Sequence, residues 1–511
     1  MSNGNHRLIS SPWAQAGVLA LVCAAVYWPM LGTGGFVATE GHRAVPAWEM
    51  LRSGDWVVTR MFDQAYLRKP PGIAWAIAGT SAVLGQTEFG ARAAAALAAC
   101  AMAFVAFGFS WRWFGRRWAL AGGLAQALMP WMWTVGRHAE IEAVHQLGVQ
   151  LGCLALIDAL VVKRDRRGRG AAGAWMLAAG VGLAWMVLTK GPAGIPAVGG
   201  VVLAACAVRR TLSPIVSARL WIPVALGGAT SGWVFGLIAR AIAHSGESPV
   251  TQSSGAFLFG DGWALKALVF VPGALIAMMP ASLALLFPWG PDARAEGVDP
   301  DTRRAFETAR ALALAALISL GVYLISGVTN VRYAMPASVF VAPAAAYVAR
   351  GALGGAFVPS RRAIGRWMML GHPIAIVGVL VLGGWAWIGT LERSQRSKSG
   401  REAGRELAQF VMGSGARELW ANGVVEARPE VLEAARGELG GSVLVRWVPG
   451  LSDVDGVPGG TVLVLRADGD ANETRILERV DRVSEPEMLG AGVFGKYRYE
   501  AWLVPNAGGR P

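Results

Sequence analysis

Charged residues gather in five short stretches of a chain that is otherwise strongly apolar. These stretches contain carboxylates that could accept a proton, and lysine and arginine side chains that could hold a phosphate group. A carboxylate beside such cations suits group transfer from a phosphate, because the cations stabilise charge on the leaving phosphate while the carboxylate deprotonates an attacking hydroxyl. The stretches are VATEGHRAVPAWEMLRSGDWVV (37–58), YLRKPPG (66–72), VGRHAEIEAVHQ (135–146), LTKGP (188–192) and TNVRYAMPA (329–337).

Two carboxylates are the candidates for proton transfer. We predict Glu40 as the catalytic base; the alternative is that its side chain caps a helix beginning near Arg43. We predict that Glu142 assists in the site; the alternative is an ion pair with Arg137 that orients two membrane spans.

The cationic candidates are predicted to bind the substrate phosphate. Lys190 directly follows an apolar run, and an ionisable group at membrane depth is costly enough to suggest a function. The alternative is a lysine whose ammonium group snorkels to the membrane surface. Arg332 and Tyr333 could bind substrate or anchor a span at the interface. Lys69 could bind phosphate, or its neighbouring prolines could simply begin a surface helix. The other predicted substrate-binding residues are Tyr66, Arg137 and His138.

The composition is that of a protein with many membrane spans. Of 511 residues, 54% are hydrophobic and only 16% are charged, whereas soluble proteins carry about a quarter charged residues. The 22 tryptophans fit anchoring at the membrane interface. We attribute the net charge of +13 to basic cytoplasmic loops rather than to nucleic-acid binding. All four cysteines lie in apolar runs without a CxxC spacing, which argues against a disulfide framework or a zinc knuckle.

The distribution of basic loops predicts the topology. If the N-terminus is cytoplasmic and the short segment 71–86 does not cross, all five basic connections lie in the cytoplasm, as the positive-inside rule requires. This arrangement predicts about 11–13 transmembrane helices, with eleven preferred, and places the five charged stretches on the outer side. The apolar segments lie near 13–33, 71–86, 92–110, 118–136, 143–162, 172–189, 193–208, 219–242, 266–288, 309–328, 334–350 and 367–390; the basic connections are 111–118, 163–170, 209–219, 289–308 and 350–366.

The end of the chain differs in character from the rest. A polar linker is predicted at 391–400, after a transmembrane domain (1–390) whose first outer loop covers 34–91. Residues 401–511 combine a helical pattern with strand-like runs and are predicted to form a small extracytoplasmic α/β domain. The supporting segments are RELAQFVMGSG (405–415), SVLVRWV (442–448), TVLVLRA (461–467) and YEAWLVP (499–505).

Taken in order, these motifs resemble the ArnT-like branch of the protein O-mannosyltransferase superfamily. The resemblance covers roughly residues 10–350 and rests on EGHRAVPAWEMLRSGDWVV with YLRKPPG, then GRHAEIEA, LTKGP and RYAMP. It implies an all-α membrane enzyme of the GT-C fold in the cytoplasmic membrane. Such an enzyme would move a sugar from a polyprenyl-phosphate donor to a lipid, glycan or protein acceptor on the outer side, by an inverting displacement. It also implies a first outer loop with helices along the membrane.

The chain departs from the family pattern at three positions. The family's first loop usually begins Asp-Glu, with the Asp proposed as catalytic; here the pair is Thr39-Glu40, so the base role is predicted to pass to Glu40. Glu142 matches a second acidic position, which is usually Asp. The residue before the KPP element is often a metal-binding Glu in aminoarabinose transferases, and here it is Arg68. No cofactor is therefore predicted with certainty, and a divalent metal stays open.

Two other classes of function compete with this interpretation. A transporter or lipid flippase would place its charges near the bilayer midplane on broken helices, whereas here they are predicted to gather at one face. A catalytically inactive relative that binds polyprenyl lipid, or serves as a scaffold, is kept open by Thr39.

Overall fold

The structure is a computed structural model, and it divides into two compact units. The first unit contains Met1–Leu31, Ala93–Gly236 and Ser253–Ile388; the second contains Gly32–Arg92, Leu237–Gln252 and Gly389–Pro511. The predicted first outer loop thus shares a unit with the predicted C-terminal domain. The residues described are 11–161, 169–251, 263–279, 281–286, 299–326, 331–354, 400–421, 428–448, 457–458, 460–466, 487–494 and 497–504.

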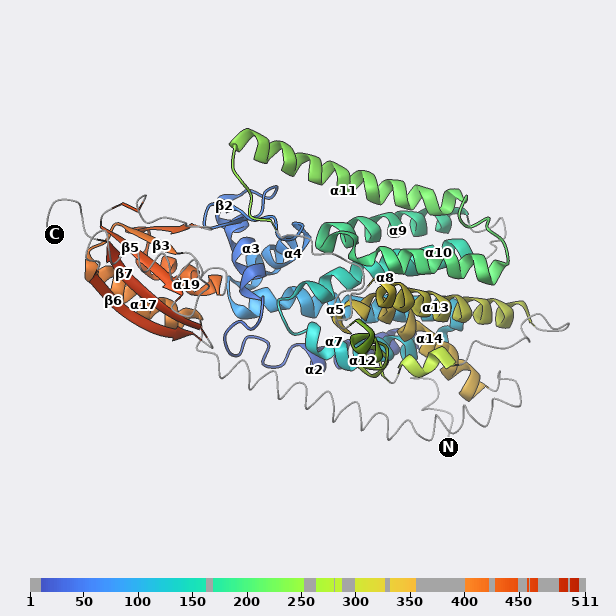
Figure 1. Cartoon of the computed structure of the whole chain (residues 1–511). Coiled ribbons are helices and arrows are strands. Elements are labelled where there is room, and N and C mark those ends of the chain that lie inside the picture. Colours follow the sequence, from blue (N-terminus) through green and yellow to red (C-terminus); the bar gives the residue numbers. More distant parts are fainter. Residues whose placement is uncertain are drawn as a thin grey trace, which may run out of the picture. The chain divides into compact units, whose positions relative to one another are not determined.

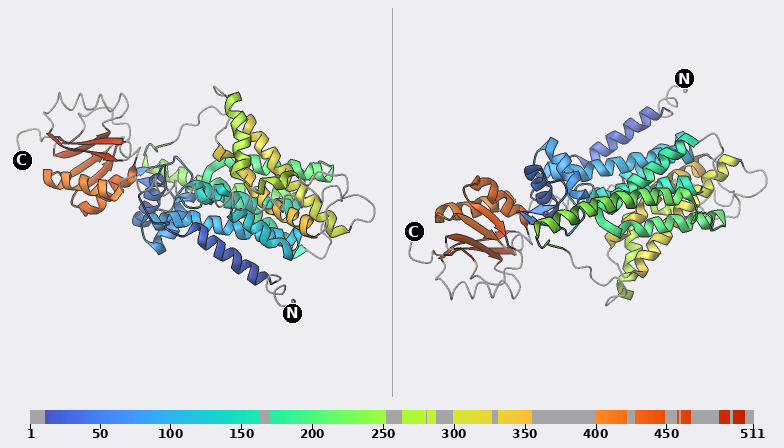
Figure 2. Two further views of the ribbon diagram at one scale, coloured as in Figure 1. Left: turned by 90° about the horizontal axis from the view of Figure 1, so that it is seen from below. Right: turned by 90° about the horizontal axis from the view of Figure 1, so that it is seen from above.

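The first unit is built from helices, most of which have roughly aligned axes (Figures 1 and 2). Helices α5 and α11 also continue into the second unit. The α-helices are α2 (Pro12–Tyr27), α5 (Glu88–Phe114), α6 (Ala119–Ala127), α7 (Pro130–Val135), α8 (Ile141–Val161), α9 (Arg169–Lys190), α10 (Ile195–Arg209), α11 (Ala218–Ser245), α12 (Trp263–Ala277), α13 (Pro300–Ile325) and α14 (Met335–Gly354); the short 3-10 helices are η1 (Arg116–Trp118), η3 (Gly191–Gly194), η4 (Ala281–Leu286) and η6 (Val331–Ala334).

The prediction of a polytopic membrane protein is confirmed. Among the described residues, five helical stretches are long and apolar enough to cross a membrane. The preferred count of eleven spans stays a prediction, because the predicted span 367–390 lies outside the described residues. The five stretches are Glu88–Phe114, Ile141–Val161, Gly173–Arg209, Ala218–Ser245 and Pro300–Ile325.

Small residues allow α8 and α9 to pack closely. A Cβ atom on Gly182 of α9 would lie 2.4 Å from the backbone nitrogen of Gly152 on α8, and one on Gly148 would lie 2.7 Å from the backbone nitrogen of Met186. Glycines at these positions let the two backbones approach each other, as is common between helices in membranes. This contact fixes the end of α9 beside the start of α8, where several of the predicted site residues lie.

The first loop forms its own small structure in the second unit. It contains α3 (Gly41–Ser53), the two-residue strands β1 (Arg60–Met61) and β2 (Gln64–Ala65), and α4 (Gly72–Leu84). Trp48 Nε1 of α3 donates a hydrogen bond to Ser81 Oγ of α4 at 3.1 Å. At 13 residues, or about 20 Å, α4 is shorter than the ~30 Å hydrocarbon core, as predicted for segment 71–86.

The C-terminal residues form the predicted α/β domain. Its five-stranded sheet has the order β4-β3-β5-β7-β6, with β3 parallel to β4 and β5, and β7 antiparallel to β5 and β6. Helices α17 and α19 pack against each other beside the sheet (Figure 1). Of the predicted linker, only Gly400 is described, and it begins α17. The elements are α17 (Gly400–Ser414), β3 (Glu418–Ala421), α19 (Pro429–Leu439), β4 (Leu444–Trp447), β5 (Thr461–Arg466), β6 (Glu487–Phe494) and β7 (Tyr497–Val504).

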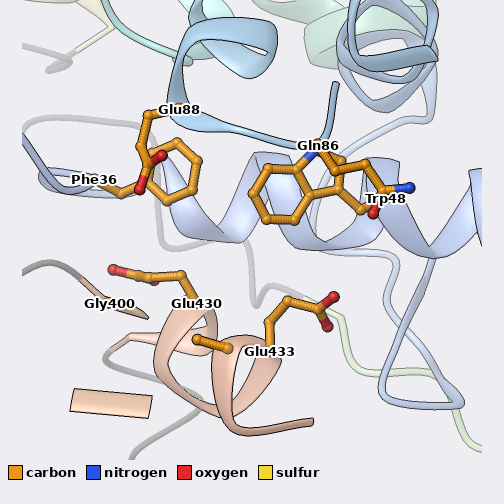
Figure 3. A pocket seen from close by; sticks show the side chains of 8 residues that line it. Phe36, Trp48, Gln86, Glu88, Gly400, Glu430 and Glu433 are labelled. Atoms are coloured by element: carbon orange, nitrogen blue, oxygen red, sulfur yellow. The ribbon is translucent and has the colours of Figure 1, made fainter. Parts of the chain in front are cut away.

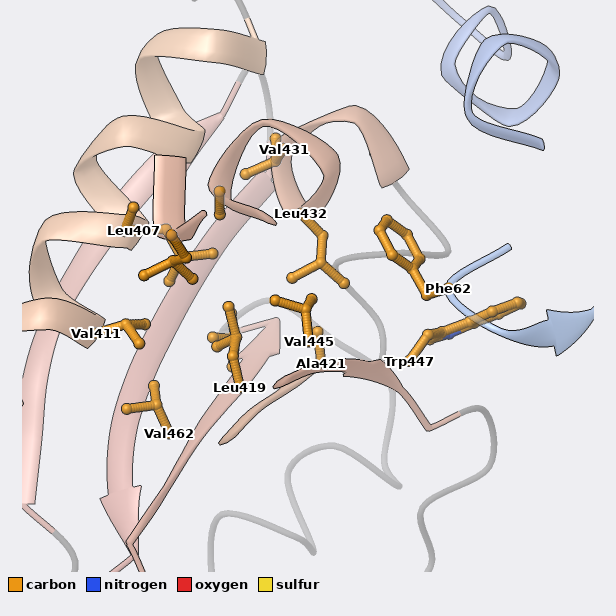
Figure 4. Packing of buried hydrophobic residues seen from close by; sticks show 14 of the residues in the cluster. Phe62, Leu407, Val411, Leu419, Ala421, Val431, Leu432, Val445, Trp447 and Val462 are labelled. Carbon is orange, nitrogen blue, oxygen red and sulfur yellow. The ribbon is translucent and has the colours of Figure 1, made fainter. Parts of the chain in front are cut away.

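The first loop and the C-terminal domain share one hydrophobic core. Four loop residues, Val45, Met61, Phe62 and Tyr66, are buried in the same cluster as residues of α17, α19 and the sheet. Figure 4 shows Phe62 facing Trp447 and Leu432 across this core. Because apolar side chains from both segments leave water together, the two segments stabilise each other.

Candidate active site

Glu142 is the centre of a charged cluster in the first unit. It lies in the first turn of α8, and its side chain is 5% exposed. Its Oε1 accepts a hydrogen bond from Lys190 Nζ at 3.0 Å and lies 3.4 Å from Arg332 Nε. The structure thus brings together three of the predicted site residues from three separate segments.

Tyr333 completes this cluster. Lys190 Nζ lies 5.0 Å from the centre of its ring, and the guanidinium carbon of Arg332 lies 5.6 Å from it, both within the ~6 Å range of cation–π contacts. Lys190 is nearly buried, whereas the Arg332 side chain is 49% exposed. A guanidinium has five N–H donors, and Arg332 contacts Glu142 through Nε.

Helix ends explain why these charges are tolerated. Glu142 lies at the N-terminus of α8 and Lys190 at the C-terminus of α9, so each charge complements the partial charge of its own helix end. The chain leaves α9 at Gly191, whose φ of +63° favours glycine. Arg332 and Tyr333 lie in the short helix η6, just before α14.

His145 lies one turn further along α8 and was not predicted. It is buried, and its Nδ1 lies 3.1 Å from the carbonyl oxygen of Met186 and 3.2 Å from Thr189 Oγ1. These contacts connect α8 to the last turn of α9, directly before Lys190. The sequence signal was present in VGRHAEIEAVHQ, because a residue three positions after Glu142 lies on the same helix face.

Arg137 and His138, the other predicted residues of this stretch, bond to the backbone. The two terminal nitrogens of Arg137 donate to the carbonyl oxygens of Val26 at 2.9 Å and Pro29 at 2.5 Å. His138 Nδ1 lies 2.7 Å from the carbonyl oxygen of Thr134. Their predicted contact with substrate stays a prediction.

Glu40 lies in the second unit and is fully buried. Its two carboxylate oxygens accept hydrogen bonds from Arg92 Nε at 2.8 Å and Arg92 Nη2 at 2.9 Å, and Oε2 also accepts one from the Val37 backbone N–H at 2.7 Å. Glu40 occupies the position before α3, but its side chain makes no capping bond to that helix. The capping alternative is therefore wrong. Two-point binding by Arg92 is what holds this carboxylate.

The two other predicted residues of the first loop also lie in the second unit. Tyr66 is only 4% exposed, and its ring packs 6.1 Å from that of Trp447, centre to centre. Lys69 is partly buried, in the bend before α4. Substrate binding by Tyr66 and Lys69 stays a prediction.

A cavity of about 160 Å³ lies between the first loop and helix α19. Figure 3 shows carboxylates from α19 facing aromatic side chains of the loop across it. Within the described ranges, no three His, Cys, Asp or Glu side chains come together in a way that could hold a metal ion. The lining residues are Phe36, Trp48, Gln86, Glu88, Gly400, Glu430, Glu433 and Ala434.

The fold is similar to that of a protein of known structure. The crystal structure of ArnT from Cupriavidus metallidurans bound to undecaprenyl phosphate matches with a TM-score of 0.62 at 17% identity, covering 95% of this chain and 97% of that chain. Residues 68–227 also match the family model of dolichyl-phosphate-mannose-protein mannosyltransferase. This chain shares the fold of ArnT. The predicted resemblance and the GT-C fold are thereby confirmed.

Two curated relatives of this chain come from Pseudomonas fluorescens (strain Pf0-1). Undecaprenyl phosphate-alpha-4-amino-4-deoxy-L-arabinose arabinosyl transferase 2 is 36% identical over 90 residues, which are 18% of this chain and 16% of the relative. Transferase 1 is 27% identical over 180 residues, which are 35% of this chain and 31% of the relative. The matches thus span less than a third of the length of either relative.

Proposed function

We propose that this chain is a glycosyltransferase that moves a sugar from a polyprenyl-phosphate donor to a lipid, glycan or protein acceptor. The reaction takes place on the outer side of the cytoplasmic membrane, with the N-terminus in the cytoplasm and the C-terminal domain outside. The observation that carries the proposal is the cluster of Lys190, Arg332 and Tyr333 around Glu142. The transferase activities for which the two relatives are named, and the complex of ArnT with undecaprenyl phosphate, support it.

Phosphate binding follows from the donors of the cluster. A phosphate accepts charge-assisted hydrogen bonds from ammonium and guanidinium groups, which are stronger than bonds between neutral groups. Lys190 and Arg332 supply these donors, and Lys69 is the proposed further ligand. Glu142 holds the two cations in place, because its Oε1 contacts both.

The chemical step needs one base. The acceptor hydroxyl oxygen attacks the anomeric carbon, the bond from that carbon to the phosphate oxygen breaks, and the hydroxyl proton passes to Glu40. The leaving polyprenyl phosphate gains negative charge, which the cations stabilise. Since Glu40 is bonded to Arg92 through both oxygens, this role requires Arg92 to release one of them.

An inactive polyprenyl-lipid-binding scaffold is the second candidate function. The observation that favours it is the complete burial of Glu40 against Arg92, next to Thr39 where the family usually has its proposed catalytic Asp. Such a protein would use the same phosphate-binding cations but would transfer no sugar.

Turnover by the purified full chain in lipid nanodiscs separates these functions. The donors are undecaprenyl-phosphate sugars, and lipid binding is measured in parallel with undecaprenyl phosphate. Arg332→Ala tests the cluster, and Arg303→Ala, which removes a half-exposed arginine of α13, is the matched control. Turnover that is lost in Arg332→Ala and kept in Arg303→Ala supports the enzyme. Lipid binding without turnover of any donor would favour the scaffold.

A further inference from the structure

We propose that the C-terminal domain is a positioning element for the reaction, because helix α19 holds helix α3 of the first loop through four charged side chains. These are Glu49 and Arg52 of α3 and Glu433 and Arg436 of α19, called the clamp below. The inference rests on the proposed function, in which the first loop contributes Glu40 and Lys69.

Opposite charges alternate around the clamp. Between the helices, Arg52 Nη1 lies 2.5 Å from Glu433 Oε1, and Arg436 Nη2 lies 2.6 Å from Glu49 Oε2. Within each helix, the Arg52–Glu49 and Arg436–Glu433 pairs are both 2.8 Å long. Every member therefore has one partner on its own helix and one on the other.

Burial distinguishes the clamp from ordinary surface ion pairs. The side chains of Glu49 and Glu433 are only 8% and 12% exposed. Burial alone would raise the pKa of Glu49, but hydrogen bonds from Arg436 and Arg52 bring it below its ordinary value. At Glu433 burial outweighs the same two arginines and raises the pKa. Exposed pairs contribute about 0–1 kcal/mol, whereas removing one partner of a buried pair is strongly destabilising. Breaking the clamp is therefore expected to destabilise the protein.

The start of α19 contacts the segment that carries Glu40. Arg428 Nη2 donates to the carbonyl oxygen of Phe36 at 2.6 Å, while Arg428 Nε donates to Glu430 Oε1 at 2.6 Å. Glu430 Oε2 lies against Gly41, where a Cβ atom would be 2.0 Å away. A side chain directly after Glu40 would therefore force the Glu430 carboxylate to shift. Figure 3 shows Glu430 and Phe36 facing each other across the cavity.

The loop needs this support because its own helix is weak. Helix α3 has 13 residues and contains Pro46, and isolated helices of this length are marginal in water. Its order comes from packing against α4 and against the shared core, where Arg436 also lies 5.1 Å from the ring of Phe62. A loop held in one conformation lets a reacting group keep its geometry without being ordered at each turnover.

Exchanging the charges one helix at a time tests the clamp. Glu49→Arg with Arg52→Glu reverses α3, and Glu433→Arg with Arg436→Glu reverses α19. Each double variant keeps the pair within its own helix but places like charges across the interface. The fourfold variant restores both pairs between the helices. All are studied as full chains in nanodiscs.

We expect each double variant to lower kcat per folded molecule by about tenfold, which corresponds to a coupling of about 1.4 kcal/mol. The fourfold variant should return to within about threefold of the wild type. Because Lys190 and Arg332 lie outside the first loop and only Lys69 lies within it, the Kd for undecaprenyl phosphate should change less than kcat. Hydrogen exchange of residues 41–53 should rise in both double variants and return in the fourfold variant.

Two outcomes would overturn the positioning role. One is wild-type kcat per folded molecule in both double variants, and the other is a fourfold variant no better than the doubles. Wild-type protein that turns over no donor would instead overturn the proposed function. The two failures are thus distinguished by the wild-type measurement alone.

Discussion

Glu142 and Glu40 are both paired with cations, but their surroundings differ. Glu142 contacts two cations, one of which, Arg332, is about half exposed. Glu40 contacts Arg92 through both oxygens, and the two side chains are 0% and 4% exposed. The first arrangement includes a half-exposed cation, whereas the second is buried on both sides of the pair. The proposed function therefore gives ligand recognition to the Glu142 cluster, and we expect Glu40 to act only when Arg92 releases it.

Removing Lys190, the nearly buried cation of the Glu142 cluster, should have the largest effect on turnover. Lys190→Ala deletes a proposed phosphate ligand and leaves Glu142 with Arg332. We expect turnover to fall by about 10²–10³-fold, the usual cost of losing a group that stabilises developing charge. The measurement is kcat/KM with an undecaprenyl-phosphate sugar, with Arg303→Ala as the control. Turnover within twofold of the wild type would remove Lys190 from the site.

Glu40→Gln tests whether the buried Glu40–Arg92 pair also takes part in the chemistry. Loss of the base should lower turnover per folded molecule by about 10²-fold. Loss of the buried charge should also destabilise the protein by about 3 kcal/mol, because Arg92 keeps its charge without a full partner. Turnover and thermal unfolding are measured on the same sample. A less stable variant with unchanged turnover per folded molecule would make Glu40 purely structural.

Tyr333→Leu, also in the Glu142 cluster, should have a smaller effect, on KM for the donor. It removes the ring that faces Lys190 and Arg332 but keeps an apolar side chain. Cation–π contacts contribute about 0.5–1 kcal/mol at partly exposed sites, so we expect KM for the donor to rise by about two- to fivefold. Tyr347→Leu, on α14, is a matched control for loss of a tyrosine, with no change in KM expected. Equal effects of the two substitutions would argue against a specific role for Tyr333.

Glu430→Gln should change the pH dependence of stability rather than turnover. Burial raises the pKa of Glu430 above its ordinary value of 4.5, and the charge of Glu40 adds to this, while Arg428 opposes it. The folded state thus binds the proton more tightly than the unfolded state. The free energy of unfolding should therefore fall as pH rises from about 4.5 through the raised pKa.

The glutamine variant lacks this titration, so its melting temperature should gain on that of the wild type as pH rises from 4 to 8. Glu438→Gln, an exposed glutamate of the same helix, is the control. If the difference in melting temperature between the wild type and Glu430→Gln stays constant from pH 4 to 8, the raised pKa of Glu430 is contradicted.

The sequence predicted the regions of the site better than the partners of its residues. Lys190 and Arg332 could be identified because each is a charged residue beside an apolar run. The charges of the loops predicted that both stretches lie on the outer side of the membrane. The partners of Glu142 depend on how α8 is rotated against its neighbours. That rotation is set by packing, such as the approach of Gly182 to Gly152, which a hydrophobicity pattern does not reveal.

Arg92 shows a signal that was present but overlooked. It is the one charge within the apolar run FGARAAAALA, and a lone charge in such a run usually has a buried partner. That partner, Glu40, lies 52 residues away. The clamp is harder to predict, since Glu49 and Arg436 are 387 residues apart. The strands of the C-terminal domain could be predicted from their strand-like sequence patterns, but their order in the sheet could not.

The most direct test of the account is an experimental structure of the full chain with undecaprenyl phosphate. We predict that phosphate oxygens lie about 3 Å from Lys190 Nζ and from the guanidinium nitrogens of Arg332, with Glu142 still bonded to Lys190. A phosphate bound to other residues, with Lys190 and Arg332 contacting only protein, would contradict the account.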